Sequence, residues 1–236
     1  QMCIRDRAYG MKVLEVKDVS KSFYSTHALT RVNFDLEKGE VLALAGENGA
    51  GKSTMMNILL GSFAPDEGTM LLNGKTYEPK NPSDALQKGI SMIHQELCLV
   101  PSMTVADNVW IGRCNQFSRC GIYMPQLCEE RTQKLFDDYG IDLNPKESVK
   151  NLSTAQMQMV EIARAISYGS QIVIMDEPTS ALSDKEVKVL YKIIRRLTQE
   201  GVSVLFISHK LEEVFDLADR AVSYTHLRAH ETPEHL

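Results

Sequence analysis

The chain has 236 residues, of which 43% are hydrophobic and 24% charged, the ordinary composition of a globular protein. Its 26 Lys and Arg against 31 Asp and Glu give a formal net charge of −5 at pH 7. Collagen, a coiled coil and wholesale disorder are excluded, and the acidic balance argues against a nucleic-acid partner, because a phosphate-tracking surface needs a basic excess. No stretch reaches the roughly 18 apolar residues that span a bilayer. We expect one large or two small domains.

The two ends of the chain look foreign to the rest. Residues 2–6 can be read from atg-tgt-ata-aga-gac, and residues 222–226 from gtc-tct-tat-aca-cat, which is the reverse complement of that DNA. The residues that follow in the same frame resemble the remainder of a transposase-type sequencing adaptor. We therefore expect residues 1–7 and 222–236 to be adaptor-derived, and residues 8–221 to form the genuine domain, with the natural chain cut short near its end.

Strands and helices alternate in the first part of the chain. Alternating apolar and polar residues predict a strand over 14–19 and a weaker strand over 28–36. A turn at Lys38-Gly39-Glu40 precedes an apolar strand over 41–45, and a glycine-rich loop then leads into a helix over 53–60. The further elements expected here are a strand over 69–72, a short helix over 83–88 and a strand over 90–93.

The pattern becomes helical between about residues 100 and 166, and then returns to alternation. Helices are expected over 105–111, 128–139 and 156–166, so we interpret this block as an inserted helical subdomain. The elements expected after it are a strand over 172–176, a helix over 184–200 with Asp184 as its cap, a strand over 202–207 and a helix over 211–217. This order indicates an α/β fold.

A phosphate-binding loop lies between the apolar strand and the helix that follows it. Its sequence matches G-x-x-x-x-G-K-[ST], whose glycines let backbone N–H groups point at phosphate oxygens while the helix N-terminus adds positive potential. Lys52 is placed to reach the β- and γ-phosphates, and Ser53 to ligate Mg²⁺. The residues expected to bind the nucleotide here are Gly46, Glu47, Asn48, Gly49, Ala50, Gly51, Lys52, Ser53 and Thr54.

A second motif ends the apolar strand over 172–176. Asp176 comes at the phosphate end of this strand, where a carboxylate can hold Mg²⁺, and Glu177 follows, where it can polarise the attacking water as a general base. Many strands end in acidic residues that merely face solvent. We interpret this pair as functional because the sequence also contains the phosphate loop. The fold class expected is a P-loop NTPase core of mostly parallel strands, with an N-terminal antiparallel β portion and the helical subdomain.

The order of the motifs resembles the nucleotide-binding domain of ATP-binding-cassette (ABC) proteins over essentially all of residues 11–220. That order is the phosphate loop, Gln95, Leu152-Ser153-Thr154-Ala155-Gln156, Asp176-Glu177 and then His209. Ile93-His94-Gln95-Glu96-Leu97 and Gln158-Met159-Val160-Glu161 are similar to the ATPases of bacterial ribose-, galactose- or xylose-type importers.

The resemblance implies roles for further residues. Gln95 would sense Mg²⁺ and the attacking water, and His209 would contact the γ-phosphate and orient Glu177. Phe23 sits where the family places an aromatic ring on adenine, although core packing is an alternative for it and Tyr24 is a neighbouring candidate. Ser153 and Gln156 would contact the nucleotide held by an opposing domain.

The signature loop departs from the family's Leu-Ser-Gly-Gly-Gln. Thr154 and Ala155 replace the two glycines, and a β-branched Thr adds bulk where glycine permits close backbone approach. We therefore expect this loop to complete a weakened ATP site on its partner, while the site built on Lys52, Asp176, Glu177 and His209 is intact.

The resemblance implies an ATP- and Mg²⁺-dependent ATPase, the first half of a tandem protein that powers a bacterial sugar importer. Its expected partners are a second ABC ATPase domain in the missing C-terminal half, transmembrane permease subunits and, indirectly, a periplasmic sugar-binding protein. The expected location is the cytoplasmic face of the inner membrane, as a peripheral subunit. The alternatives are a soluble ABC ATPase without a transporter, an importer of another small solute, and a non-hydrolysing regulator.

Overall fold

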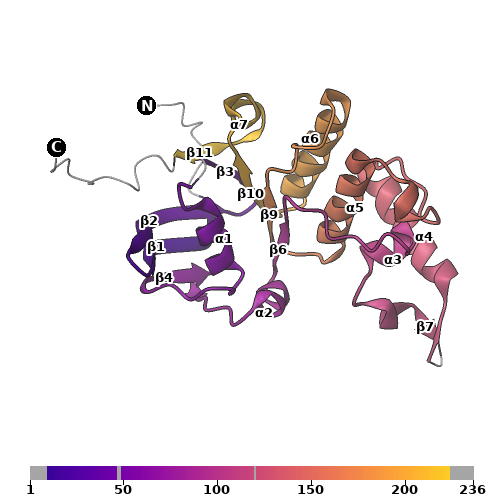
Figure 1. The fold of residues 1–236 in the computed structure, drawn as a ribbon, viewed down its shortest axis with the longest axis horizontal. Coiled ribbons are helices and arrows are strands. Elements are labelled where there is room, and N and C mark those ends of the chain that lie inside the picture. Colours follow the sequence, from indigo (N-terminus) through magenta and orange to yellow (C-terminus); the bar gives the residue numbers. More distant parts are fainter. Residues whose placement is uncertain (1–9, 47–48, 120, 224–236) are drawn as a thin grey trace.

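The computed structural model describes residues 10–46, 49–119 and 121–223. An antiparallel sheet, a parallel sheet and a group of helices follow one another along the molecule (Figure 1). The antiparallel sheet has the strand order β2-β1-β4-β5, and the parallel sheet has the order β11-β3-β10-β9-β6. No helix in this part of the chain is long and apolar enough to cross a bilayer.

The expected strands are all present, and no end differs from its predicted position by more than four residues. The strands are β1 (Lys12–Phe23), β2 (Thr26–Glu37), β3 (Val41–Ala45), β4 (Glu67–Leu72), β5 (Lys75–Thr76), β6 (Ile90–Ile93), β7 (Ser118–Arg119), β8 (Ile122–Tyr123), β9 (Ile172–Asp176), β10 (Ser203–Ser208) and β11 (Arg220–Ser223). The sequence did not predict β5, β7, β8 or β11, which are two to four residues long. Strands this short do not contain enough residues to show the alternation of apolar and polar side chains that predicts a strand.

The expected helices are also present. They are α1 (Lys52–Leu59), α2 (Pro82–Gln87), α3 (Val105–Val109), α4 (Pro125–Tyr139), α5 (Thr154–Ser167), α6 (Asp184–Gln199) and α7 (Leu211–Leu217), with the short 3₁₀ helices η1 (Cys114–Phe117) and η2 (Val149–Asn151). One detail of the prediction is wrong: Ser183 caps α6, in a capping box with Glu186, and Asp184 is the first helical residue. The backbone N–H and the hydroxyl of Ser183 both donate to the Glu186 carboxylate, which lies in the first turn of the helix.

Successive side chains of the parallel strands belong to two separate core clusters, one on each face of the sheet. On β10, Val204 and Phe206 face a cluster that includes α5 and α6, whereas Leu205 and Ile207 face a cluster that includes α1 and the antiparallel sheet. Because successive side chains of a strand point to opposite faces, the parallel sheet is covered on both sides. The helix α1 therefore packs between the two sheets.

The helical part is locked by polar contacts as well as by apolar packing. The buried Trp110 donates from its Nε1 to Thr132 on α4 at 2.9 Å. The Arg113 guanidinium stacks between the rings of Trp110 and Tyr168, and it also donates to Ser167 at the end of α5. Helices α3, α4 and α5 are therefore held to one another by specific contacts.

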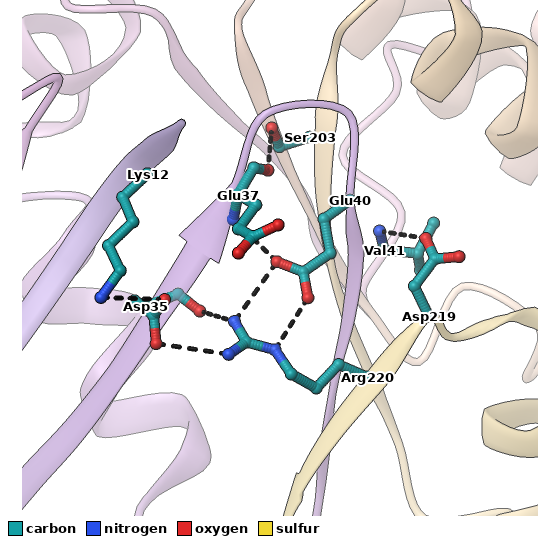
Figure 2. A network of polar contacts seen from close by, with 8 residues as sticks. All are labelled: Lys12, Asp35, Glu37, Glu40, Val41, Ser203, Asp219 and Arg220. Atoms are coloured by element: carbon teal, nitrogen blue, oxygen red, sulfur yellow. Dashed lines mark hydrogen bonds and ion pairs between the residues drawn. The ribbon is translucent and has the colours of Figure 1, made fainter. Parts of the chain in front are cut away.

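A charged network joins the two sheets near β11. Arg220 donates from its Nε to the nearly buried Glu40 at 2.8 Å and also contacts Asp35 on β2 (Figure 2). The other residues of the network are Lys12, Glu37, Val41, Ser203 and Asp219. Burial raises the pKa of Glu40, although the backbone N–H of Glu37 and the guanidinium of Arg220 act in the opposite direction. The ionised carboxylate of Glu40 therefore depends on Arg220.

The strand β11 includes the first two residues of the C-terminal segment that we expected to be foreign. Val222 and Ser223 pair with Leu44 and Ala45 of β3 in parallel register. The Val222 side chain also packs against the cluster that contains α1. The remaining residues of the two expected adaptor-derived segments, 1–7 and 224–236, lie outside the described part of the chain.

Removal of the Arg220 side chain should destabilise the protein. In Arg220→Met the carboxylate of Glu40 loses its charged partner. We expect the free energy of unfolding at pH 7 to fall by about 2 kcal/mol. This loss is smaller than for a fully buried ion pair, because the Arg220 side chain is 42% exposed. The loss should be smaller at pH 5, because protonation of Glu40 removes its unpaired charge. Urea denaturation at the two pH values measures both effects.

Arg195→Met is the matched control for that experiment. Arg195 lies 3.7 Å from Asp219 with a half-exposed side chain, so its removal should change the unfolding free energy by less than about 0.5 kcal/mol. An equal loss for the two variants would show that Glu40 does not need Arg220.

Candidate nucleotide site

The register of the parallel sheet brings three loops to one edge. Ser208 of β10 pairs with Ala45 of β3, and Ile207 pairs with Asp176 of β9. The carboxyl ends of β3, β10 and β9 therefore lie side by side, and ligands of open α/β sheets bind at such an edge. The phosphate loop, Glu177 and His209 follow these three strand ends directly.

The phosphate loop curls around the amino group of its lysine. Lys52 is the first residue of α1, only 8% exposed, and its Nζ donates to the carbonyl oxygen of Gly46 at 2.6 Å. Gly49 and Gly51 have φ values of 83° and 91°, in the left-handed region that favours glycine. Glu47 and Asn48 of the predicted loop lie outside the described residues.

A cleft of about 240 Å³ opens in front of this loop. It brings together eight of the sixteen site residues that the sequence predicted, and it adds three residues from the start of β2 that the sequence did not predict. The lining residues are Thr26, His27, Ala28, Gly49, Gly51, Lys52, Ser53, Thr54, Gln95, Asp176 and Glu177. Gly46 and Ala50 belong to the loop but do not line the cleft.

Asp176 is partly buried in this cleft. Burial raises its pKa above the ordinary value, the adjacent Glu177 raises it further, and His94 and Lys52 lower it by a smaller amount. Two neighbouring carboxylates with little solvent repel each other, so the cleft favours a cation beside Asp176. This is an electrostatic property of the apo site that the motif alone could not show.

Glu177 has an unusual backbone conformation. Its φ is 45°, which is sterically unfavourable for a residue with a side chain. Its N–H donates to the carbonyl oxygen of Ile207 at 3.0 Å, and its carbonyl accepts from Ser180. Its Oε1 lies 2.8 Å from Nδ1 of His209, so the predicted pair is in direct contact. These contacts aim the Glu177 carboxylate into the cleft.

A buried polar cluster behind this pair was not predicted. The carboxylate of Glu213 on α7 accepts from Thr179 and Ser208 at 2.7 Å each, and from Lys210 at 2.9 Å. Burial raises the pKa of Glu213, but the three hydrogen bonds outweigh it and the net direction is downward. The cluster ties the loop after β9 to the turn after β10. It holds Glu177 and His209 in register.

The aromatic candidate Phe23 lies beside the cleft but does not line it. Phe23 pairs with Thr26 at the end of the β1–β2 hairpin, and its ring packs edge-on against Phe63 with centroids 5.2 Å apart. Phe23 is 37% exposed, whereas Tyr24 in the turn is fully exposed. The ring of Phe23 is therefore fixed by packing, accessible to solvent, and next to Thr26 of the cleft wall.

The signature residues are separate from this cleft. Ser153 caps α5, accepting from the N–H of Gln156, while the side chain of Gln156 accepts from the N–H of Ser153. Neither residue lines the cleft, and Thr154 beside them is exposed. Their position suits contact with another molecule, as the resemblance implied.

Comparisons with known proteins agree with this arrangement. The profile of the ABC transporter family matches residues 29–180. The chain belongs to the ABC transporter family. The resemblance inferred from the motifs and the predicted fold class are therefore confirmed. The site roles of the individual residues stay predictions.

Curated relatives of this ABC domain are named as sugar import ATP-binding proteins. The galactose/methyl galactoside import ATP-binding protein MglA of Clostridium perfringens is 45% identical over 208 residues, which are 88% of this chain and 40% of that protein. A protein of Burkholderia cenocepacia, named provisionally as a ribose/galactose/methyl galactoside import ATP-binding protein, is 50% identical over 207 residues, 88% of this chain and 39% of that protein. This chain thus spans about two fifths of their length.

Solved ABC structures share the fold. A nucleotide-free ATP-binding cassette from an ABC transporter superposes with a TM-score of 0.79 at 26% identity, covering 90% of this chain and 87% of that one. A dimeric cassette with bound ADP and phosphate superposes at 0.75 and 24% identity, covering 89% of this chain and 93% of that one.

The donor set of this ABC domain suits Mg²⁺. Ser53, Gln95 and Asp176 line one cleft and offer hydroxyl, amide and carboxylate oxygens, the hard donors that Mg²⁺ prefers. The raised pKa of Asp176 adds an electrostatic reason, since a dication would relieve the repulsion from Glu177.

Neutralising Asp176 should stabilise the nucleotide-free domain. A carboxyl whose pKa is raised on folding binds protons more tightly when folded, so its charged form destabilises the folded state at pH 7. Asp176→Asn should therefore increase the free energy of unfolding at pH 7. The gain should shrink as the pH falls towards about 4, the pKa of an unfolded Asp. Urea denaturation in EDTA, without nucleotide, measures it.

The exposed Asp142 supplies the control for this measurement. Asp142→Asn should leave the unfolding free energy within about 0.5 kcal/mol of the parent. A loss of stability in Asp176→Asn at pH 7 would show that the Asp176 charge is favourable in the apo site.

Proposed function

We propose that this chain is the ATP-binding and ATP-hydrolysing subunit of a bacterial monosaccharide importer, and the first half of a tandem ATPase. The observation that carries the proposal is the cleft in which Lys52 and Ser53 of the phosphate loop face Gln95, Asp176 and Glu177. The names of the curated relatives support the sugar as the transported solute, and their greater length supports a second half.

Residues that line the cleft, together with His209 and Phe23 beside it, share the work of binding and hydrolysing ATP in this proposal. The amino group of Lys52 and the N–H groups of the loop bind the β- and γ-phosphates. Glu177 acts as general base towards the attacking water, and His209, bonded to its Oε1, orients it. Phe23 stacks on the adenine ring from the rim of the cleft. Ser53, Asp176 and Gln95 would hold Mg²⁺, which supplies positive charge to the phosphate oxygens.

Two such domains close on two ATP molecules in this proposal. The exposed Thr154 and the cap formed by Ser153 and Gln156 face the nucleotide of the second domain, and closure drives the transmembrane permease subunits. A periplasmic sugar-binding protein delivers the solute to the permease and has no direct contact with this chain. The subunit then works at the cytoplasmic face of the inner membrane, as a peripheral protein.

The general-base role is tested in the complete transporter reconstituted in vesicles. Glu177→Gln keeps ATP binding but removes proton abstraction, so ATP hydrolysis should fall by about 100-fold or more at this site while ATP stays bound. Lys52→Ala removes the phosphate contact and should abolish ATP binding. Single-turnover hydrolysis and filter binding of labelled ATP measure the two effects.

Glu212→Gln is the matched control, because Glu212 is an exposed carboxylate near the same edge of the sheet. It should bind and hydrolyse ATP as the parent does. Retained hydrolysis in Glu177→Gln would remove Glu177 from the role of general base, and sugar uptake unaffected by Lys52→Ala would contradict the proposed function.

Replacing Thr154 and Ala155 by glycine tests whether the signature loop weakens the ATP site of the partner domain. Thr154 begins α5 at an exposed position, where its branched side chain limits how closely a nucleotide can approach the helix N-terminus. In the full assembly, Thr154→Gly/Ala155→Gly should raise nucleotide affinity at the partner site about fivefold, from closer N–H contacts. Unchanged affinity and ATP turnover would show that this loop already functions fully.

A further inference from the structure

One wall of the cleft has no role in the mechanism above. Thr26, His27 and Ala28, from the start of β2, line the cleft together with the phosphate loop. His27 is the member of this group that carries a titratable side chain. It is exposed to solvent, so packing does not explain its position.

The imidazole of His27 is held from behind by the neighbouring strand. Ser22 lies directly opposite His27 in the β1–β2 pairing, and its Oγ is 2.9 Å from Nδ1 of the ring. The N–H of Ser22 donates to Asp66 at 2.7 Å, and the ammonium of Lys21 contacts the same carboxylate at 2.6 Å. These two donors hold the pKa of Asp66 below its ordinary value, so it stays an ionised anchor.

This anchoring decides which nitrogen is available to a ligand. When Ser22 donates to a neutral ring through its hydroxyl, the hydrogen of His27 lies on Nε2. When the ring is protonated, Nδ1 donates to Ser22 and Nε2 again carries a hydrogen. In the remaining state, a neutral ring whose Nδ1–H donates to Ser22, Nε2 has no hydrogen, and an anionic ligand favours the two states in which it has one. The contact with Ser22 engages Nδ1 and leaves Nε2 for a ligand.

The wall lies in direct contact with the phosphate loop. A Cβ added to Gly51 would come within 2.5 Å of the carbonyl oxygen of Ala28, so the backbones of the two segments touch. Gly51 immediately precedes α1, whose N-terminal N–H groups bind phosphate in the proposed function. His27 is therefore one residue away from the rim of the phosphate cradle.

The charges of the cleft favour a second donor there. Among the described residues that line it, Lys52 and His27 are the two that can carry positive charge, against the carboxylates of Asp176 and Glu177. The phosphate chain of a nucleotide carries several negative charges. A second donor in the cleft would offset part of the repulsion between these phosphate charges and the two carboxylates.

We propose that His27 is a further nucleotide-binding residue that donates its Nε2–H to an oxygen of the phosphate chain, with Ser22 as the residue that positions it. The proposal rests on the proposed function, because it needs a nucleoside triphosphate in this cleft. It adds the β1–β2 hairpin to the phosphate loop as a second source of contacts to the phosphates.

The test compares ATP with inorganic triphosphate, which has no ribose or base. Each displaces a fluorescent ATP analogue from the 236-residue chain, and the dissociation constants are compared among variants. His27→Leu should weaken both ligands by the same factor, about fivefold. His27→Lys should bind both about as well as the parent, because an ammonium also contacts phosphate. Ser22→Ala should weaken both by less than His27→Leu does.

The alternatives give different results. Weaker ATP binding with unchanged triphosphate binding would place His27 on the ribose or base, and unchanged binding of both would make it a surface residue; either result overturns the proposal. If neither ligand binds the parent chain, the proposed function itself fails. The unfolding free energy of His27→Leu should equal that of the parent, because the side chain is exposed, and His27→Gln provides a second variant that keeps a donor.

Discussion

The parallel register of β3, β10 and β9 is the constraint on which the rest of the site depends. These strands end at the same level, so three sequence segments that lie far apart along the chain deliver their first loop residues to one edge. Because the strands are buried on both faces, a shift in register by one residue would move each side chain to the opposite packed face and separate Lys52 from Glu177 at once. Stability of the core and alignment of the site are therefore the same requirement.

Two energetically unfavourable features, a backbone conformation and a charge, lie at this edge of the sheet. Glu177 adopts a positive φ, and Asp176 carries a charge that its surroundings disfavour. The buried contacts of Glu213 with Thr179 and Ser208 hold the adjoining loops and so keep Asp176 and Glu177 in place. Strain that persists only because surrounding structure enforces it is typical of functional sites.

Much of the fold could be predicted because local signals agree with it. The strands β3, β6 and β9 have the bounds expected from short apolar runs, and the phosphate loop and Asp176-Glu177 are contiguous motifs. The wall at His27 and the cluster around Glu213 could not be found in this way. Both depend on pairing between residues that only the folded chain brings together, and neither has a distinctive spacing.

The contact between Ala28 and Gly51 makes the site depend on the packing of the β1–β2 hairpin. Because this backbone contact joins β2 to the start of α1, the cleft is complete only while the β1–β2 hairpin is docked on the α1 side of the core. A ligand that bridges the two would bind the docked state alone and draw the local opening equilibrium towards it. Amide hydrogens of the hairpin, far from the reacting phosphate, would then exchange more slowly when the cleft is filled.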